Sequence, residues 1–379
     1  MSKYVLIPDS FKGTMSSRDI CRIVAEEIYA QEPDAEVCAI PMADGGEGTV
    51  EAFLTAVGGQ QVAVACTGPY GEPITACYGL LPDGTAVVEM AAAAGLPMVG
   101  ENRDPERTTT YGVGQLIAHA VSRGARRIVL ALGGSATNDG GCGAAAALGA
   151  AFFNEKGETF VPVGGTLKDI ARISTEGMAE TLRGTPFMTM CDIDNPLCGS
   201  MGAAAVFGPQ KGADPAMVRR LDEGLHHLAE VIRRDLGRDV LTLPGGGAAG
   251  GFGAGAAAFF ASPLRMGIDV VLELTAFDEK AADADLIITG EGRLDSQSLR
   301  GKVVIGVARR AKALGIPTAA LVGASETDMA AAYGEGVSGV FPINPAPASF
   351  EEEVKAHCRE NLRFTAANLV RFYRAVRRL

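Results

Sequence analysis

The sequence predicts an α/β protein, a doubly wound parallel sheet with a large inserted mixed α/β domain. Two observations favour this fold class. Both ends of the 379-residue chain alternate short apolar runs with helical patterns, as strand–helix–strand units do. Aromatic residues make up only 6% of the chain and glycines number 49, which suits closely packed layers. One five-stranded sheet is preferred over two separate half-sheets, because two parallel strands alone make a poor domain.

The N-terminal elements come in the order strand, helix, strand. Tyr4–Ile7 is a short apolar run and is predicted as a buried strand. Ser16 or Ser17 is expected to cap a helix whose apolar residues recur at helical spacing. Glu36–Pro41 follows as the second strand, and a short helix comes after it. The sheet is interrupted at this point.

The C-terminal region repeats the same alternation. Because helices separate its strands, these strands are expected to continue the parallel sheet in the order 2-1-3-4-5. The strands are predicted over Asp285–Thr289, Pro317–Val322 and Gly339–Ile343. The helices are predicted over Gly301–Leu314, Met329–Gly334 and the closing stretch Ser349–Leu379.

The middle of the chain, residues 61–271, is predicted to be the inserted domain, so that residues 1–60 and 272–379 form one discontinuous domain. Its clearest helix has Asp214 as N-cap and Pro215 as first residue, and stops at Gly237. Its strands look mixed and are predicted over Gln61–Cys66, Ile74–Leu81, Thr85–Met90, Arg126–Leu132 and Phe187–Met190.

Charge and composition argue against several classes of protein. The formal net charge is −11, whereas a nucleic-acid partner calls for a basic face. The uncharged segment 240–264 is too rich in Gly and Ala for membrane insertion and is predicted as a loop and a buried helix. The eight cysteines include no C-x-x-C pair and the N-terminus shows no signal peptide, so free thiols in the cytoplasm are expected.

Six glycine-rich loops, five of which carry charged residues, are predicted to follow strands directly. Glycine lets backbone N–H groups approach a ligand, and a helix that begins there directs several of them at an anion. Six such loops argue against a role in turns alone. The loops are Pro8–Gly13, Ala43–Thr49, Gly133–Gly141, Cys191–Gly199, Gly245–Gly255 and Gly290–Ser298.

Charged residues in these loops suit phosphate chemistry, and each has a structural alternative. Asp192 and Asp194 are two residues apart, so in an extended segment they point the same way, which suits Mg²⁺. The alternative is that one of them caps the turn that follows. Lys12 lies between a strand and a helix, where it can neutralise a transferred phosphate, and its alternative is an exposed turn.

Two further acidic positions carry alternatives of the same kind. Asp139 precedes a Gly/Ala-rich helix, so its alternative role is that of an N-cap. Glu291 and Asp295 flank Arg293, and these three residues form an internally paired loop under the structural alternative.

An NAD-dependent oxidoreductase of a small hydroxy acid is the alternative function. Gly245–Gly250 matches G-x-G-x-x-G, and Asp269 follows about 20 residues later, as a dinucleotide site requires. However, the match lies late in the chain, and a run with this many glycines matches the pattern by chance. A Walker A loop is excluded at Gly301–Lys302, because Ser296 and Val303 occupy two positions that its pattern reserves for other residues.

Taken together, the loops resemble the bacterial type I glycerate kinase family, the glycerate 2-kinases. The motifs stand in the family's order between about Tyr4 and Asn368. They are PDSFKG, ADGGEGT, GGSATNDGG, the block Cys191–Ala213 with FGPQKGA, G-x-GAAGG, GEGRLDSQS and GK-x-x-IGVA. Departures are small, such as TMSS after Gly13 and Cys142 in place of Ala. The resemblance implies a flavodoxin-like domain with a large inserted α/β domain. It also implies Mg²⁺ and ATP-dependent phosphorylation of D-glycerate, usually to 2-phosphoglycerate.

The resemblance also suggests roles for individual residues. Asp192 is expected to be the general base or a Mg²⁺ ligand, with Asp194 as a further ligand, and Lys12 to neutralise the transferred phosphate. Arg293 is expected to clamp the glycerate carboxylate through its guanidinium. The other residues expected at the substrates are Asp44 and Glu47 for hydroxyls or metal-bound water, and Asp9, Ser10, Glu291, Asp295 and Lys302 for the polar lining. Those expected to hold the nucleotide are Gly133, Gly134, Ser135, Asn138, Asp139, Gly245, Gly246 and Gly250.

Topology predicts where these residues meet, because doubly wound sheets bind ligands where the winding direction reverses. One wall of a cleft between the domains is expected to carry Lys12, Asp44, Glu291 and Asp295. The other wall is expected to carry Asn138, Asp139 and Asp192. The expected partners are D-glycerate and ATP, with neither nucleic acid nor membrane. The oligomeric state (monomer or homodimer), the adenine-binding residues and the identity of the base stay open.

Overall fold

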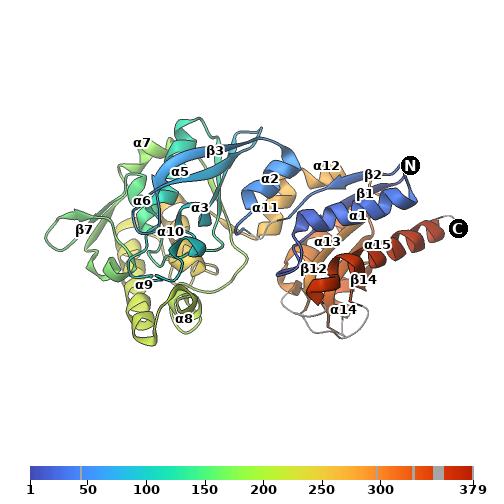
Figure 1. The fold of residues 1–379 in the computed structure, drawn as a ribbon. Helices are drawn as coiled ribbons and strands as arrows, with labels where there is room; N and C mark the ends of the chain where they lie inside the picture. Colours follow the sequence, from blue (N-terminus) through green and yellow to red (C-terminus); the bar gives the residue numbers. More distant parts are fainter. Residues whose placement is uncertain (43–44, 296–297, 327–328, 345–353, 378–379) are drawn as a thin grey trace. The chain divides into compact units, whose positions relative to one another are not determined.

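The computed structural model describes residues 1–42, 45–295, 298–326, 329–344 and 354–377 (Figure 1). The chain divides into two compact units. The first unit comprises Met1–Asp44, Thr55–Val57 and Met266–Leu379, and the second comprises Gly45–Leu54 and Gly58–Arg265. The two ends of the chain therefore fold together, and the long middle segment forms a unit of its own.

The first unit contains a five-stranded parallel sheet in the order β14-β13-β12-β1-β2. Numbered along the chain within this sheet, the order is 2-1-3-4-5, which confirms the predicted fold class. The central strands β1 and β12 pair from Tyr4 beside Leu286 to Pro8 beside Gly290. The strands are β1 (Lys3–Pro8), β2 (Glu36–Ala39), β12 (Leu286–Leu294), β13 (Thr318–Ser325) and β14 (Gly339–Pro342).

Helices cover both faces of this sheet. On one face, α1 (Ser17–Gln31) and α15 (Lys355–Arg377) run side by side and pack on apolar residues of β1, β12 and β13 (Figure 1). On the other face, α13 (Val303–Leu314) and α14 (Ala330–Gly334) pack on the alternate residues of β13. Ser16 caps α1, because its hydroxyl accepts a hydrogen bond from the Asp19 N–H at 3.1 Å. The remaining helices of this unit are α11 (Gly267–Leu274), α12 (Phe277–Ala281) and η3 (Ser298–Arg300).

The second unit is built on a mixed six-stranded sheet in the order β11-β10-β6-β5-β4-β3, as the mixed strand pattern predicted. β3, β4 and β5 are antiparallel, whereas β5, β6, β10 and β11 are parallel. The strands are β3 (Gln60–Thr67), β4 (Pro73–Leu80), β5 (Thr85–Glu89), β6 (Arg127–Ala131), β10 (Phe187–Met190) and β11 (Leu264–Arg265). A small sheet that the pattern did not predict contains β7 (Ala151–Phe153), β8 (Thr159–Phe160) and β9 (Arg172–Ser174).

Helix α9 (Pro215–Leu236) begins and ends as predicted. The Asp214 side chain accepts hydrogen bonds from the N–H groups of Ala216 and Met217, and Gly237 adopts φ 68° to end the helix. The other helices between β2 and β11 are α2 (Thr49–Val57), α3 (Ala91–Ala94), α4 (Leu96–Val99), α5 (Tyr111–Ser122), α6 (Cys142–Ala147), η1 (Gly164–Asp169), α7 (Met178–Leu182), α8 (Ala203–Phe207), η2 (Pro209–Lys211) and α10 (Ala248–Phe260).

The glycines of Gly245–Gly255 let α10 pack closely against the loop that follows β6. A Cβ atom on Gly250 would lie 2.0 Å from the carbonyl oxygen of Thr137, and one on Gly255 would lie 2.1 Å from that of Gly140. Gly250 also has φ +65°, a conformation that side-chain-bearing residues rarely adopt. The glycine content of this segment is therefore explained by close backbone packing.

Two predictions about local structure are wrong. Gly290–Leu294 is not a loop but continues β12, because Glu291 pairs with Val322 and Arg293 with Ala324 of β13. No strand precedes Gly245, because residues 237–247 form irregular structure and turns after α9. The glycine pattern at Gly245–Gly250 therefore lacks the strand from which a dinucleotide-binding loop starts.

Two global features bear on the chain's surroundings. No helix in the described residues combines the length and the apolarity needed to cross a membrane. All eight cysteines lie within the described residues, and none of them forms a disulfide.

Candidate active site

The first unit gathers polar side chains at the carboxyl ends of its central strands, β1 and β12. Asp9 follows β1, and its backbone N–H donates to the Gly290 carbonyl of β12 at 2.8 Å. Glu291 is the next residue along β12 and is buried, with 7% of its surface exposed. The winding direction reverses between these two strands, which is where doubly wound sheets bind ligands. This edge of the sheet is therefore the candidate site of the first unit.

Glu291 has an unusual environment for a carboxylate. One of its oxygens, Oε1, has no hydrogen-bond partner among the described residues. Burial raises its pKa to about 7; Asp9 and Asp295 act in the same direction, whereas a hydrogen bond with Ser298 and the charge of Lys302 oppose them. Glu291 therefore changes its protonation state near neutral pH.

Arg293 and Asp295 face one another at the end of β12. The Nε atom of Arg293 lies 3.8 Å from Oδ2 of Asp295, and the arginine side chain is largely exposed. The Oδ1 atom of Asp295 accepts a hydrogen bond from the Ser298 N–H at 3.2 Å. Two of the three residues of the structural alternative, Arg293 and Asp295, are thus paired, while Glu291 and Arg293 lie in β12 rather than in a loop. Lys302 is half-buried at the N-cap of α13, and the role of Arg293 toward glycerate stays a prediction.

Ser10 and Lys12 follow β1 in a short anchored turn. The Ser10 N–H donates to the Asp9 carboxylate at 2.7 Å. A backbone bridge joins Phe11 to Met15, and both of these side chains are buried, so the turn is held in place. Lys12, between them, is exposed. The anchored turn therefore fixes the position of Lys12 at the end of β1.

Three of the predicted loops converge in the second unit. The Gly133 N–H donates to the Gly45 carbonyl at 2.8 Å, and a Cβ atom on Gly133 would lie 2.5 Å from the Cα of Gly46. A Cβ atom on Gly45 would lie 3.4 Å from the Cβ of Met190, the last residue of β10. The loops after β6 and β10 and the described part of ADGGEGT therefore meet there.

Glu47 is exposed, and Asp44 lies outside the described residues. The buried Glu89 at the end of β5 accepts a hydrogen bond from the Val50 N–H at 2.6 Å and so caps α2. Burial raises the pKa of Glu89. Glu89 was not singled out from the sequence, although a carboxylate at the end of an apolar strand is a usable signal.

Lys211 is a second residue that the motifs did not single out, although FGPQKGA contains it. It is 3% exposed, and its Nζ atom donates to the Ser135 hydroxyl at 2.8 Å and to the Thr137 carbonyl at 2.7 Å. Burial lowers the pKa of Lys211 to about 7, and the charge of Asp139 opposes this shift. Through these two hydrogen bonds, Lys211 holds the loop after β6 in place.

The same loop holds buried polar atoms without partners. Asn138 is 1% exposed, and neither its Oδ1 nor its Nδ2 has a hydrogen-bond partner among the described residues; the same holds for the Thr137 hydroxyl. Buried polar groups are normally hydrogen-bonded, and exceptions call for an explanation such as a bound ligand or water. This property fits the predicted role of Asn138 in ligand binding.

Asp139 is occupied by its own fold. Its carboxylate accepts hydrogen bonds from the N–H and the hydroxyl of Thr110, both at 2.8 Å, and from the N–H groups of Gly141 and Gly143. Burial raises its pKa, whereas these hydrogen bonds lower it. Asp139 thus holds the backbone at the start of α6, although Gly141 rather than Asp139 is the N-cap residue, and contact with a nucleotide stays a prediction.

Asp192 and Asp194 lie in the irregular segment after β10, with Asp192 half-buried and Asp194 exposed. Within the described ranges, no group of three or more His, Cys, Asp or Glu side chains is arranged to hold a metal ion. Mg²⁺ takes only one or two carboxylates and completes its shell with water and phosphate oxygens. These two carboxylates therefore fit Mg²⁺ in donor type and number.

In the glycine-rich stretch Gly245–Gly255, backbone N–H groups are already hydrogen-bonded within the protein. The Gly246 N–H donates to the Leu243 carbonyl at 2.9 Å, and the Gly247 N–H donates to the Asn195 carbonyl at 3.0 Å. Gly245, Gly246 and Gly250 are all buried. Their predicted contact with a nucleotide stays a prediction, as it does for the exposed Gly134.

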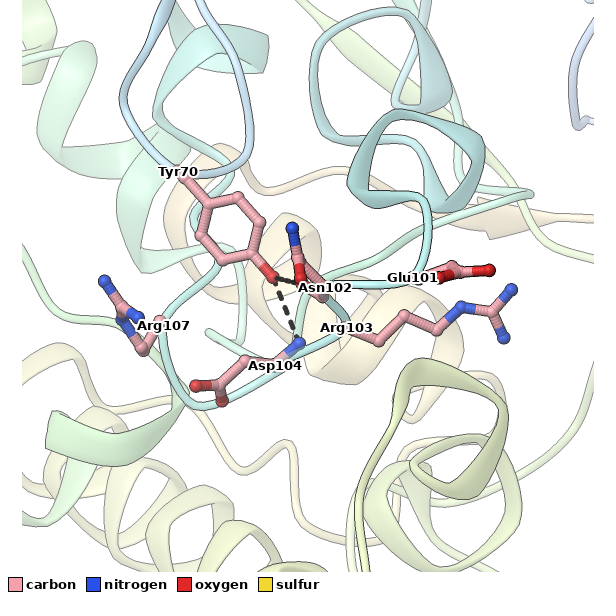
Figure 2. Close-up of a pocket in the computed structure, with 6 residues that line it drawn as sticks. All are labelled: Tyr70, Glu101, Asn102, Arg103, Asp104 and Arg107. Atoms are coloured by element: carbon pink, nitrogen blue, oxygen red, sulfur yellow. Dashed lines mark hydrogen bonds between the residues drawn. The ribbon is translucent and has the colours of Figure 1, made fainter.

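A cavity of about 470 Å³ opens in the second unit, away from the predicted residues. Figure 2 shows Tyr70 directed at the loop of Asn102 and Asp104 across it. The Tyr70 hydroxyl donates to the Asn102 carbonyl and accepts from the Asp104 N–H at 3.1 Å. Arg107 stands over the Tyr70 ring at 6.0 Å from its centroid. None of the predicted site residues lines this cavity, which is completed by Glu101 and Arg103.

Replacing Lys211 with methionine should change how stability depends on pH. Because the pKa falls from 10.5 to about 7 on folding, the unfolded chain binds the extra proton between these values, so the free energy of unfolding rises with pH there. Lys211→Met lacks this rise. In urea unfolding, the free energy of unfolding of the wild type should rise between pH 7 and pH 9 by on the order of 2 kcal/mol more than that of the variant. An equal difference at both pH values contradicts the prediction, and the exposed Lys156→Met is the control.

Comparisons with known proteins agree with the resemblance. The model of the glycerate kinase family matches residues 4–374. The chain is 45% identical over 369 residues to a glycerate kinase of Bacillus cereus, covering 97% of each chain, and 42% identical over 352 residues to the glycerate 2-kinase of Escherichia coli K12, covering 92% of each. A crystal structure from Salmonella typhimurium LT2, described under the name glycerate kinase 2, superposes with a TM-score of 0.87 at 43% identity over the whole of both chains. The chain therefore belongs to the glycerate kinase family and is a kinase.

Proposed function

We propose that the protein transfers the γ-phosphoryl group of ATP to D-glycerate in a Mg²⁺-dependent reaction, giving 2-phosphoglycerate and ADP. Family membership supports glycerate as the acceptor. The observation that carries the finer proposal is the cluster of Asp9, Glu291, Asp295 and Lys302 at the point where the sheet reverses its winding. A small hydroxy acid needs such mixed charges, because a cationic side chain binds its carboxylate and carboxylate side chains accept hydrogen bonds from its hydroxyls.

The residues divide into groups that suit phosphoryl transfer, which requires positioning and charge stabilisation rather than covalent chemistry. Lys12 would neutralise the transferred phosphate, and Arg293 would hold the glycerate carboxylate. The loop after β6, supported by Lys211, would hold nucleotide phosphates. Asp192 and Asp194 would hold Mg²⁺, which when bound neutralises phosphate charge. That both units contribute to one site stays a prediction.

No observation favours the oxidoreductase alternative, because the glycine pattern at Gly245–Gly250 has no strand before it. We propose the cytoplasm as the place of the reaction, in keeping with eight cysteines that form no disulfide. Analytical ultracentrifugation would distinguish the two expected oligomeric states, monomer and homodimer.

ATP consumption should require both D-glycerate and a divalent ion. A coupled ADP assay should show turnover with D-glycerate and Mg²⁺, loss of turnover on chelation with EDTA, and recovery when Mg²⁺ is restored. L-glycerate and lactate serve as matched acceptors. Turnover that is independent of the acceptor, or that persists with the ion removed, contradicts the proposal, as does rapid NADH oxidation without ATP consumption.

A further inference from the structure

The carboxylate at the carboxyl end of β12 differs from the other buried acids of the protein. Asp139 accepts four hydrogen bonds, and Glu89 holds the start of α2. Glu291 is equally buried, yet its Oε1 has no partner among the described residues. A buried carboxylate oxygen without a partner is costly, so its presence calls for a function.

The position of Glu291 points to substrate chemistry. Its strand pairs with β1, and the backbone of Asp9, at the end of β1, hydrogen-bonds to the residue before it. Glu291 lies on the strand β12 at the reversal of winding, where a ligand of this fold class binds. Gly292, the next residue, lies against the backbone of the turn that carries Lys12, because a Cβ atom on Gly292 would be 3.6 Å from the Lys12 backbone nitrogen. The Glu291 side chain, one residue earlier on the strand, points to the opposite face. Glu291 therefore lies at the end of β12 next to the residue that the Asp9 backbone contacts, on the ligand-binding edge of the sheet.

We infer that Glu291 is the general base of the reaction, which takes the proton from the glycerate hydroxyl that becomes phosphorylated; this rests on the proposed function. The O–H bond of the hydroxyl breaks and its proton passes to Oε1 of Glu291. The hydroxyl oxygen forms a bond to the γ-phosphorus of ATP. The bond from that phosphorus to the β–γ bridging oxygen breaks, and its electron pair leaves on ADP. Asp192 is thereby left with the role of metal ligand.

The charges around Glu291 suit this role. Burial, Asp9 and Asp295 favour the protonated form, and Ser298 and Lys302 favour the carboxylate, so that the group titrates at about 7. Arg293, on the same strand, is paired with Asp295. The facing residues of β13, from Val322 to Ala324, carry no charge. A base with a pKa near the working pH combines a deprotonated fraction with sufficient basicity.

The test compares Glu291→Gln with the wild type in the glycerate-dependent assay as a function of pH. Wild-type kcat/KM should fall about tenfold per pH unit below about pH 7. Glu291→Gln should lose about 10²- to 10⁴-fold in kcat, change KM much less, and lack this acid limb. Glu291→Asp should keep the limb with intermediate activity. Asp9→Asn should move the limb to lower pH, because it removes a charge that raises the pKa of Glu291.

Several results overturn the inference. Glu291→Gln with kcat within threefold of the wild type does so, as does an acid limb that persists unchanged in that variant. If Glu291→Gln fails to fold, an unshifted limb in a folded Asp9→Asn enzyme overturns it instead. A wild type that leaves D-glycerate unphosphorylated overturns the proposed function as well, whereas an active wild type beside an equally active Glu291→Gln overturns the base alone.

Discussion

Asp192→Asn should lower kcat for glycerate phosphorylation by about 10²-fold or more, equivalent to a few kcal/mol of barrier. The substitution keeps the shape of the side chain but removes the negative charge that makes it a ligand for Mg²⁺. The Mg²⁺ concentration for half-maximal rate should rise at least tenfold. Thermal stability should change little, because Asp192 is a half-buried residue in an irregular segment.

The matched control for this variant is Asp169→Asn, which removes an exposed aspartate from η1 of the same unit. It should leave both kcat and the Mg²⁺ requirement unchanged. An Asp192→Asn enzyme that melts far earlier yet keeps its kcat would instead support the structural alternative, in which Asp192 only caps a turn.

Lys12→Met should also lower kcat by about 10²-fold, because it removes the positive charge proposed to neutralise the transferred phosphate. The melting temperature should be nearly unchanged, since Lys12 is exposed and its turn is anchored by Phe11 and Met15. Lys12→Arg should recover part of the activity, because it restores the charge without the same reach. Steady-state kinetics over a range of ATP concentrations measure all three enzymes.

Lys156→Met serves as the control for lost positive charge, because Lys156 is exposed in the turn between β7 and β8. If Lys12→Met raises KM for ATP but leaves kcat intact, Lys12 contributes only to substrate binding. If it changes neither constant, Lys12 is the exposed turn lysine of the structural alternative.

The sheet of the first unit was predictable because its local signals agree. Apolar runs as short as Tyr4–Ile7 mark buried strands, and intervening helices imply parallel connections, so the order of strands follows. The continuation of β12 through Gly290–Leu294 was not predictable from composition, because glycines and charged residues imitate a loop. Pairing with β13 overrides that local preference, and such pairing depends on residues far away in the sequence.

The polar residues of the site were predictable as loop motifs, whereas their division of labour was not. Burial and hydrogen bonding decide it: Asp139 and Glu291 look alike in sequence, yet one is fully hydrogen-bonded and the other has an oxygen without a partner among the described residues. The role of Lys211 was not predictable because it also depends on burial, and a lysine between Gln210 and Gly212 gives no sign in the sequence of being buried.

The most direct test of the central claim is ³¹P NMR of a single reaction mixture containing the enzyme, D-glycerate, ATP and Mg²⁺. The γ-phosphate resonance of ATP should disappear while ADP and 2-phosphoglycerate appear in equal amounts. Release of inorganic phosphate without phosphoglycerate, or no change in ATP, would contradict glycerate phosphorylation, and formation of 3-phosphoglycerate would contradict the proposed product.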